Sequence, residues 1–210
     1  MAGSLVTVVG ASGAGKDTLL GAARAALAAD PRFVFARRVI TRPAEARNHP
    51  GAEDHSPMTE AEFEAARADG AFALHWRAHG LCYGIPRAIE RDMVEGRVVV
   101  ANLSRTVLAE AAARYRLRVL LVTAPPAVLA ARLAGRGRES AAEIALRLGR
   151  EATLPEGLAV REVANDGTPE EGAARLLAAL RAVAAPFPPE RLADRLPPGK
   201  AFPEPGRPNG

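Results

Sequence analysis

Short apolar runs and longer amphipathic stretches alternate along most of the chain. Nearly continuous apolar runs predict strands buried on both faces, at 5–9, 98–103 and 117–123. Less regular runs predict further strands at 33–43, 72–76, 81–85 and 158–164. Amphipathic stretches predict helices at 18–27, 59–70, 86–95, 106–115, 125–133, 141–151 and 169–184. This alternation predicts the α/β class, with a parallel sheet flanked by helices.

Two segments fall outside the alternation. Residues 44–57 are polar and contain His, Pro and Gly, so they are expected to form a loop. From Pro186 onward the chain is rich in Pro, Gly and charge and has little apolar periodicity. The pattern therefore predicts one domain over residues 1–185 and a mostly unstructured tail over 186–210.

The stretch after the first apolar run has the spacing G-x-x-x-x-G-K of a phosphate-binding loop (P-loop). Glycines let backbone N–H groups turn toward phosphate oxygens, and the next helix directs its positive N-terminal end at the same anion. Lys16 can then reach the β- and γ-phosphates of a nucleoside triphosphate. The expected nucleotide-binding residues are Gly10, Ala11, Ser12, Gly13, Ala14, Gly15, Lys16, Asp17 and Thr18.

The loop departs from the usual pattern at one position. Asp17 stands where Ser or Thr normally offers a hydroxyl to Mg²⁺. A carboxylate is also a hard oxygen ligand, so Mg²⁺ binding remains compatible with the sequence. Asp17 and Thr18 are both candidate metal ligands, and the sequence does not choose between them.

Composition narrows the function classes. The net charge is +4 and the pI is about 9.9, but the arginines are spread singly and only 4% of residues are aromatic, which favours anionic small substrates over nucleic acid. The single cysteine, Cys82, excludes an internal disulfide and suits a reducing cytoplasm. Neither a membrane-spanning run nor a signal peptide is expected, since the first strand leads directly into the loop.

Several segments together carry a family resemblance over about residues 1–180. They are the P-loop with Gly-Lys-Asp, the run 38–43, the run 70–86 with His-Trp and Tyr-Gly-Ile-Pro, and the runs 102–105 and 132–139. The chain resembles the guanylate-kinase branch of the nucleoside monophosphate kinases. Within that branch it is most similar to the ribose 1,5-bisphosphate phosphokinases of phosphonate degradation.

The resemblance implies a guanylate-kinase-like P-loop fold with an acceptor-binding insertion at about 36–85 and a lid at about 135–140. It also implies a kinase that uses ATP and Mg²⁺ to convert the phosphosugar ribose 1,5-bisphosphate into 5-phospho-α-D-ribose 1-diphosphate (PRPP), an enzyme of PRPP biosynthesis. Two alternatives stay open: a guanylate kinase with altered acceptor contacts, and a non-catalytic binding module. An intact P-loop argues against the module, since a pure scaffold has no need of triphosphate binding.

The resemblance also implies roles for individual residues. Lys16 would act in catalysis with the phosphate-contacting or lid arginines Arg132, Arg136 and Arg147. Asn165 falls where relatives approach the adenine. Candidate acceptor-binding residues are Arg38, Arg42, His75, Tyr83, Ser104, Arg105 and Arg138.

The positions that read guanine in guanylate kinases differ in this chain. By the resemblance, two hydroxyls and two carboxylates are replaced by Arg38, His75, Ile85 and Leu103, while Glu45 and Asp54 replace an arginine and a tyrosine that hold the phosphate of GMP. The sequence therefore predicts that guanine is rejected as an acceptor. His75 and His79 are four residues apart, but their strand-like surroundings argue against a zinc site.

Overall fold

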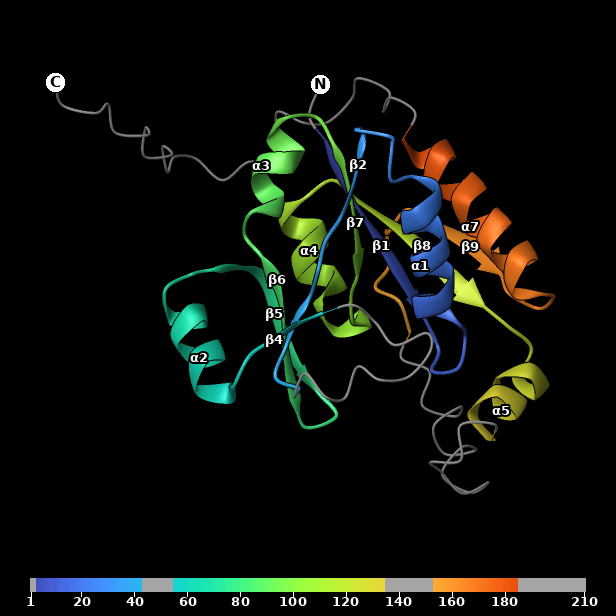
Figure 1. Cartoon of the computed structure of the whole chain (residues 1–210), viewed down its shortest axis with the longest axis horizontal. Helices are drawn as coiled ribbons and strands as arrows, with labels where there is room; N and C mark the ends of the chain where they lie inside the picture. Colours follow the sequence, from blue (N-terminus) through green and yellow to red (C-terminus); the bar gives the residue numbers. More distant parts are fainter. Residues whose placement is uncertain (1–2, 43–54, 135–152, 185–210) are drawn as a thin grey trace, which may run out of the picture.

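A five-stranded parallel sheet forms the centre of the computed structural model, which describes residues 3–42, 55–134 and 153–184 (Figure 1). The strand order is β2-β7-β1-β8-β9, and every neighbouring pair is parallel. The strands are β1 (Ser4–Gly10), β2 (Phe33–Phe35), β7 (Val98–Asn102), β8 (Leu117–Thr123) and β9 (Val160–Ala164).

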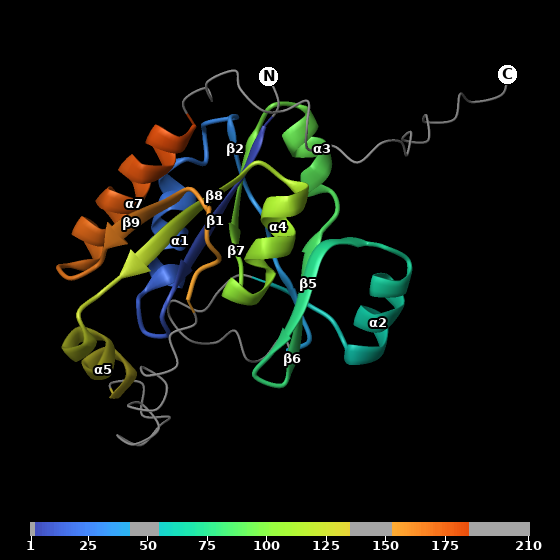
Figure 2. The same ribbon diagram turned by 180° about the vertical axis from the view of Figure 1, so that it is seen from behind.

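Helices cover both faces of this sheet because its inner strands are apolar on both sides. Along β1, Leu5 and Val9 pack on one face, and Val6 and Val8 pack on the other. The second face is covered by α1 (Lys16–Ala26) and α7 (Pro169–Val183), which lie side by side (Figures 1 and 2). The first face receives α3 (Ile89–Val94) and α4 (Leu108–Arg114). A short 3₁₀ turn, η2 (Arg105–Val107), precedes α4, and α5 (Pro126–Ala134) follows β8. The predicted α/β class with a parallel sheet is confirmed.

A second, four-stranded sheet packs against the first face. Its order is β4-β3-β6-β5, and its core is the antiparallel pair β5 (Phe72–Ala78) and β6 (Leu81–Pro86). Strand β3 (Val39–Ile40) pairs antiparallel with β6 and parallel with β4 (Ser56–Pro57). Successive side chains of each strand again point to opposite faces of the sheet. Ile40, Trp76 and Tyr83 join the core beneath the main sheet.

The outer side of the second sheet is covered by α2 (Glu60–Ala68), at the opposite end of the molecule from α7 (Figures 1 and 2). Phe63 of α2 stacks on Phe72 of β5 with ring centroids 4.6 Å apart. The Phe72 ring leaves no room for a side chain at Gly84 of β6, since an added Cβ there would lie 2.6 Å from the ring. The Thr-x-x-Glu spacing at 59–62 is that of a capping box, and this box is present at the start of α2, with the Thr59 hydroxyl accepting from the Glu62 N–H.

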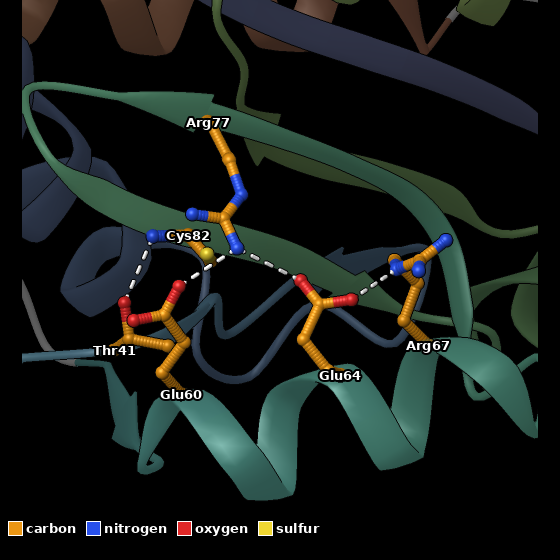
Figure 3. A network of polar contacts seen from close by, with 6 residues as sticks. All are labelled: Thr41, Glu60, Glu64, Arg67, Arg77 and Cys82. Atoms are coloured by element: carbon orange, nitrogen blue, oxygen red, sulfur yellow. Dashed lines mark hydrogen bonds and ion pairs between the residues drawn. The ribbon is translucent and has the colours of Figure 1, made fainter.

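Arg77 of β5 forms ion pairs with α2 at the surface of the protein (Figure 3). Its Nη2 lies 2.7 Å from Glu60 Oε1 and 3.0 Å from Glu64 Oε1. Glu64 also accepts from Arg67 Nε at 2.7 Å, and these arginines hold the pKa of its carboxyl below the usual range, Arg67 having the larger effect. On the neighbouring strand β6, Cys82 lies directly opposite Arg77, and its N–H donates to Thr41 Oγ1 at 2.8 Å.

The structure differs from the sequence prediction in three details. The predicted strand 33–43 is two strands, β2 in the parallel sheet and β3 in the second sheet, joined by residues 36–38. The helix predicted from Pro86 begins at Ile89, because Pro86 still pairs with Phe72 at the end of β6. The predicted loop 44–57 ends in β4. The predicted lid 135–140, the helix 141–151 and the tail 186–210 lie outside the described residues. No described helix is long and apolar enough to cross a membrane.

Candidate active site

The P-loop joins the carboxyl end of β1 to the first turn of α1, as the motif predicts. Gly15 caps α1 with φ 88°, a left-handed conformation that favours glycine. The Lys16 ammonium folds back over the loop and donates to the carbonyl oxygens of Gly10 (2.9 Å) and Ala11 (3.0 Å). The loop thus places the Lys16 ammonium and the N-terminus of α1 at the same end of the sheet, an arrangement suited to binding phosphate.

Asn165 holds the P-loop through a hydrogen bond from its side chain. It follows β9, is 3% exposed, and its N–H donates to the Thr123 carbonyl at 2.7 Å. Its Nδ2 donates to the Ala14 carbonyl at 2.7 Å, and an added Cβ at Gly15 would lie 2.5 Å from that nitrogen. The side chain that the resemblance places near adenine is therefore directed at the backbone of the loop, where it contacts Ala14 and lies against Gly15.

Arg132 approaches the loop from α5. Its Nη1 lies 3.8 Å from the position of an added Cβ at Gly15. That nitrogen is buried and has no hydrogen-bond partner among the residues that the structure describes. A buried guanidinium nitrogen without an acceptor is costly, and a phosphate oxygen on the loop would satisfy it. The other implied arginines of this region, Arg136, Arg138 and Arg147, lie outside the described residues.

Both candidate metal ligands, Asp17 and Thr18, are exposed in the first turn of α1. Asp17 Oδ1 accepts a hydrogen bond from Asn102 Nδ2 at 3.0 Å. No cluster of three or more His, Cys, Asp or Glu in the described residues could hold a metal alone. Mg²⁺ at phosphate sites is bound by one or two protein oxygens plus phosphates and water, so the single carboxylate at the loop fits this ion.

Arg38 lies between the two sheets, in the segment that joins β2 to β3. Its guanidinium carbon is 5.2 Å from the ring centroid of Tyr83 and 5.9 Å from that of Trp76. These rings stack on each other at 5.3 Å with an interplanar angle of 4°. Arg38 Nη1 also donates to the Asn102 carbonyl at 3.3 Å. The Trp76–Tyr83 pair and Arg38 therefore lie beside the end of β7, whose last residue, Asn102, also contacts Asp17.

The remaining candidates are distributed around this centre. Arg42 is half-buried just after β3, and Arg105 begins η2. The Ser104 hydroxyl caps η2 by accepting from the Thr106 N–H at 3.3 Å. His75 is exposed and lies on the α2 side of β5, because its neighbours Leu74 and Trp76 face the core. The structure therefore brings Arg38 and Tyr83 together but leaves His75 on the opposite face.

Asn102 is the site residue that the sequence prediction missed. Its side chain contacts Asp17 and its carbonyl contacts Arg38, although the three residues are far apart in the chain. Its sequence signals were its polarity within the apolar run 98–103 and its place in the segment 102–105, which carries the family resemblance. Such a residue at the carboxyl end of a parallel strand is placed where ligands of α/β sheets bind.

Comparison with known proteins identifies close relatives. No family model matches the sequence. The chain is 51% identical over 183 residues to ribose 1,5-bisphosphate phosphokinase PhnN of Methylobacterium radiotolerans, a match that covers 87% of this chain and 99% of the relative. It is 53% identical over 178 residues to the protein of the same name from Acidiphilium cryptum, covering 85% of this chain and 92% of that relative.

Solved structures provide a comparison of the fold. The guanylate kinase of Anaplasma phagocytophilum superposes with a TM-score of 0.61 at 19% sequence identity, and the match covers 88% of each chain. The likeness at this identity concerns the fold, which is that of a guanylate kinase.

Proposed function

The chain belongs to the ribose 1,5-bisphosphate phosphokinase family, and we propose that it transfers the γ-phosphoryl group of ATP to ribose 1,5-bisphosphate, giving ADP and PRPP. The observation that carries this proposal is the match, at half identity, to relatives of that name over nearly their whole length. The cations around the P-loop support it independently, because the reaction must bring two polyanions close together.

The donor half of the reaction uses the P-loop. Lys16 would exchange its contacts with the loop carbonyls for the β- and γ-phosphates of ATP, and Arg132 would supply a second cation from α5. Asp17 would hold Mg²⁺ together with phosphate oxygens and water. When bound, this ion supplies charge neutralisation between the phosphates. The loop residues Gly10 to Thr18 would contribute backbone N–H groups to the same phosphates.

The acceptor oxygen needs no general base. It belongs to the 1-phosphate of the sugar, whose second pKa is about 6, so it is largely dianionic at neutral pH. Catalysis then depends on bringing this dianion in line with the γ-phosphate and on compensating the charge of both groups. Cations on the acceptor side therefore matter more than a proton acceptor, and Arg38, Arg42 and Arg105 are the described arginines in this role.

The positions that read guanine in guanylate kinases suit a sugar phosphate better than a purine in this chain. Ile85 and Leu103 are 0% and 4% exposed and pack with Tyr83 in the core. The resemblance to guanylate kinases puts polar side chains that read guanine at these two positions. Aliphatic side chains there cannot pair the hydrogen-bonding groups of a base, at a cost of roughly 1–3 kcal/mol for each unmet bond. Arg38, at a third such position, adds a charge that suits a second phosphate.

The test is a phosphorylation assay with Mg²⁺-ATP against ribose 1,5-bisphosphate, GMP and dGMP, with products separated by mass. We expect PRPP and ADP from the sugar bisphosphate and little product from either nucleotide. Turnover of GMP equal to that of ribose 1,5-bisphosphate would contradict the proposal. Mg²⁺-ATP binding without turnover of any acceptor would favour a binding module.

A further inference from the structure

Asn102 is a buried polar side chain at the end of an otherwise apolar strand. The preceding residues of β7, Val98 to Ala101, lie in the two cores of the sheet, and Asn102 pairs with Val8 of β1. It is only 7% exposed. Burying an amide is unfavourable unless its hydrogen-bonding groups are used, so its partners indicate what it does.

Those partners lie on both sides of the candidate active site. The side-chain Nδ2 donates to Asp17 Oδ1 at 3.0 Å, across 85 positions of sequence. The backbone carbonyl accepts from Arg38 Nη1 at 3.3 Å. Asn102 is thus the residue through which the P-loop carboxylate and the acceptor-side arginine are joined.

Asp17, the unusual residue of the P-loop, explains why an amide partner such as Asn102 is needed. A Ser or Thr hydroxyl at position 17 would be neutral and short. The Asp17 carboxylate is charged, exposed, and close to where the phosphates of ATP would lie, so its orientation decides whether it binds Mg²⁺ or repels phosphate. A carboxylate can only accept hydrogen bonds at neutral pH, and the Asn102 amide offers an N–H to one of its oxygens. The second oxygen is left for the metal.

We propose that Asn102 is a positioning residue that orients the Asp17 carboxylate toward the Mg²⁺ of Mg²⁺-ATP. The proposal rests on the proposed function for its nucleotide and metal, and goes beyond it by assigning a residue that holds the metal ligand. The Arg38 contact gives the positioning residue a fixed place between the two sheets. The substitution of Asp for Ser or Thr in the loop and the Asn at the end of β7 then form one functional pair.

The test is an isothermal titration of the full-length protein with ATP, in excess Mg²⁺ and again in EDTA. Asn102→Leu keeps the branched shape of the side chain and removes its donor. We expect about tenfold weaker binding of Mg²⁺-ATP, the size of a lost hydrogen bond to a charged group, and unchanged binding of ATP in EDTA. Equal weakening in both conditions, or none in either, would overturn the proposal, because a purely structural role does not depend on the metal.

A double-mutant cycle provides the matched control. Asp17→Thr restores the ordinary hydroxyl of the motif, which needs no amide partner. In that background, Asn102→Leu is expected to change Mg²⁺-ATP affinity less than twofold. A full tenfold effect there would contradict the pairing. If Asn102→Leu does not fold, Asn102→Ala serves instead: it removes the donor without adding a charge, so the same metal-dependent loss is expected.

These titrations contain no acceptor, so they separate this proposal from the proposed function. A wild-type protein that binds Mg²⁺-ATP but leaves ribose 1,5-bisphosphate unchanged contradicts only the function. A protein that makes PRPP and whose Mg²⁺-ATP affinity is insensitive to Asn102 contradicts only the positioning role.

Discussion

Few residues carry the charge that a phosphate would meet at the P-loop. Lys16 is one of only two lysines in the chain, and it folds onto the loop carbonyls. Arg132 directs a buried nitrogen at the same loop. Asp17 supplies the opposite sign, held by Asn102. Because each of these groups has a distinct contact, single substitutions should separate their contributions.

Replacing the loop lysine should abolish turnover without unfolding the protein. Lys16 is half-buried and its ammonium donates to the carbonyls of Gly10 and Ala11, so Lys16→Ala removes little apolar packing. We expect PRPP formation to fall about a thousandfold, the scale of losing one cation at a transferring phosphoryl group. The rate and the melting temperature check this, with Lys200→Ala as the matched variant of the only other lysine. Near-normal turnover in folded Lys16→Ala would remove the loop from the mechanism.

Replacing Arg132 should separate stability from activity. Its Nη1 is buried without a partner in the described part of the chain, so Arg132→Met removes an unfavourable burial. We expect a melting temperature of the ligand-free protein equal to or above that of wild type. Turnover is expected to fall roughly a hundredfold, as for loss of one preorganised donor. Arg161→Met, at an exposed position of β9, should alter neither quantity. A lower melting temperature with full activity would make Arg132 structural.

Among the elements, α2 depends on the second sheet for most of its contacts. Phe63 is its one buried side chain, and the Arg77 pairs with Glu60 and Glu64 lie at the surface. A nine-residue helix is marginal in isolation. Its capping box and the apolar contact with Phe72 therefore set its position, while the surface ion pairs add a smaller contribution.

That smaller contribution should depend on pH. Because Arg67 and Arg77 lower the pKa of Glu64 in the folded protein, its pairing stabilises the fold above the ordinary value of 4.5 and is lost as pH falls through the lowered value. Glu64→Gln should lower the melting temperature by about 2 °C at pH 7. Melting curves against pH check this, with Glu156→Gln in an exposed turn as the control. The deficit is expected to shrink below about pH 4.5; a deficit that persists unchanged at pH 3 would show another origin.

Sequence reasoning was most successful where the pattern is local. The P-loop and its flanking strand and helix follow from adjacent residues, and so do the capping box at Thr59 and the existence of strands β5 and β6. The prediction of one strand over 33–43 was wrong, because the apolar residues on either side of Arg37 and Arg38 belong to two different sheets, and a sequence pattern does not show which sheet a short strand joins. Asn102 was missed for a related reason: its role depends on Asp17 and Arg38, which only the folded chain brings near.

For the whole molecule, the two sheets share one core. Leu5 and Val99 of the main sheet belong to the same buried cluster as Ile40, Leu74 and Ile85 of the second sheet. Shared burial makes it unfavourable for one sheet to unfold while the other stays folded. The P-loop and the acceptor-side aromatic pair are consequently parts of one cooperative unit, and thermal unfolding of the described body should occur in a single transition.

The Pro-rich segment after this body should be dispensable. Helix α7 ends at Val183, whose carbonyl accepts from Arg118 Nη1 at 2.7 Å, and nearly the whole M. radiotolerans relative is matched by only 87% of this chain. Truncation after Ala185 keeps these contacts. We expect an unchanged melting temperature and unchanged PRPP formation, because residues 186–210 offer few apolar groups to bury. Loss of several degrees, measured by calorimetry, would show that Phe187 or its neighbours contact the body.

The stacked aromatic pair beneath Arg38 has an optical consequence. Trp76 is the only tryptophan of the chain, and it is 7% exposed beside Tyr83 and the Arg38 guanidinium. Its fluorescence emission therefore reports on the surroundings of Arg38 and Tyr83 alone, because the chain has no other indole. An anion that draws the guanidinium from the ring face alters the electric field at the fluorophore. If ribose 1,5-bisphosphate binds at Arg38 as proposed, we expect its titration to change the Trp76 emission, so that binding can be followed without a label.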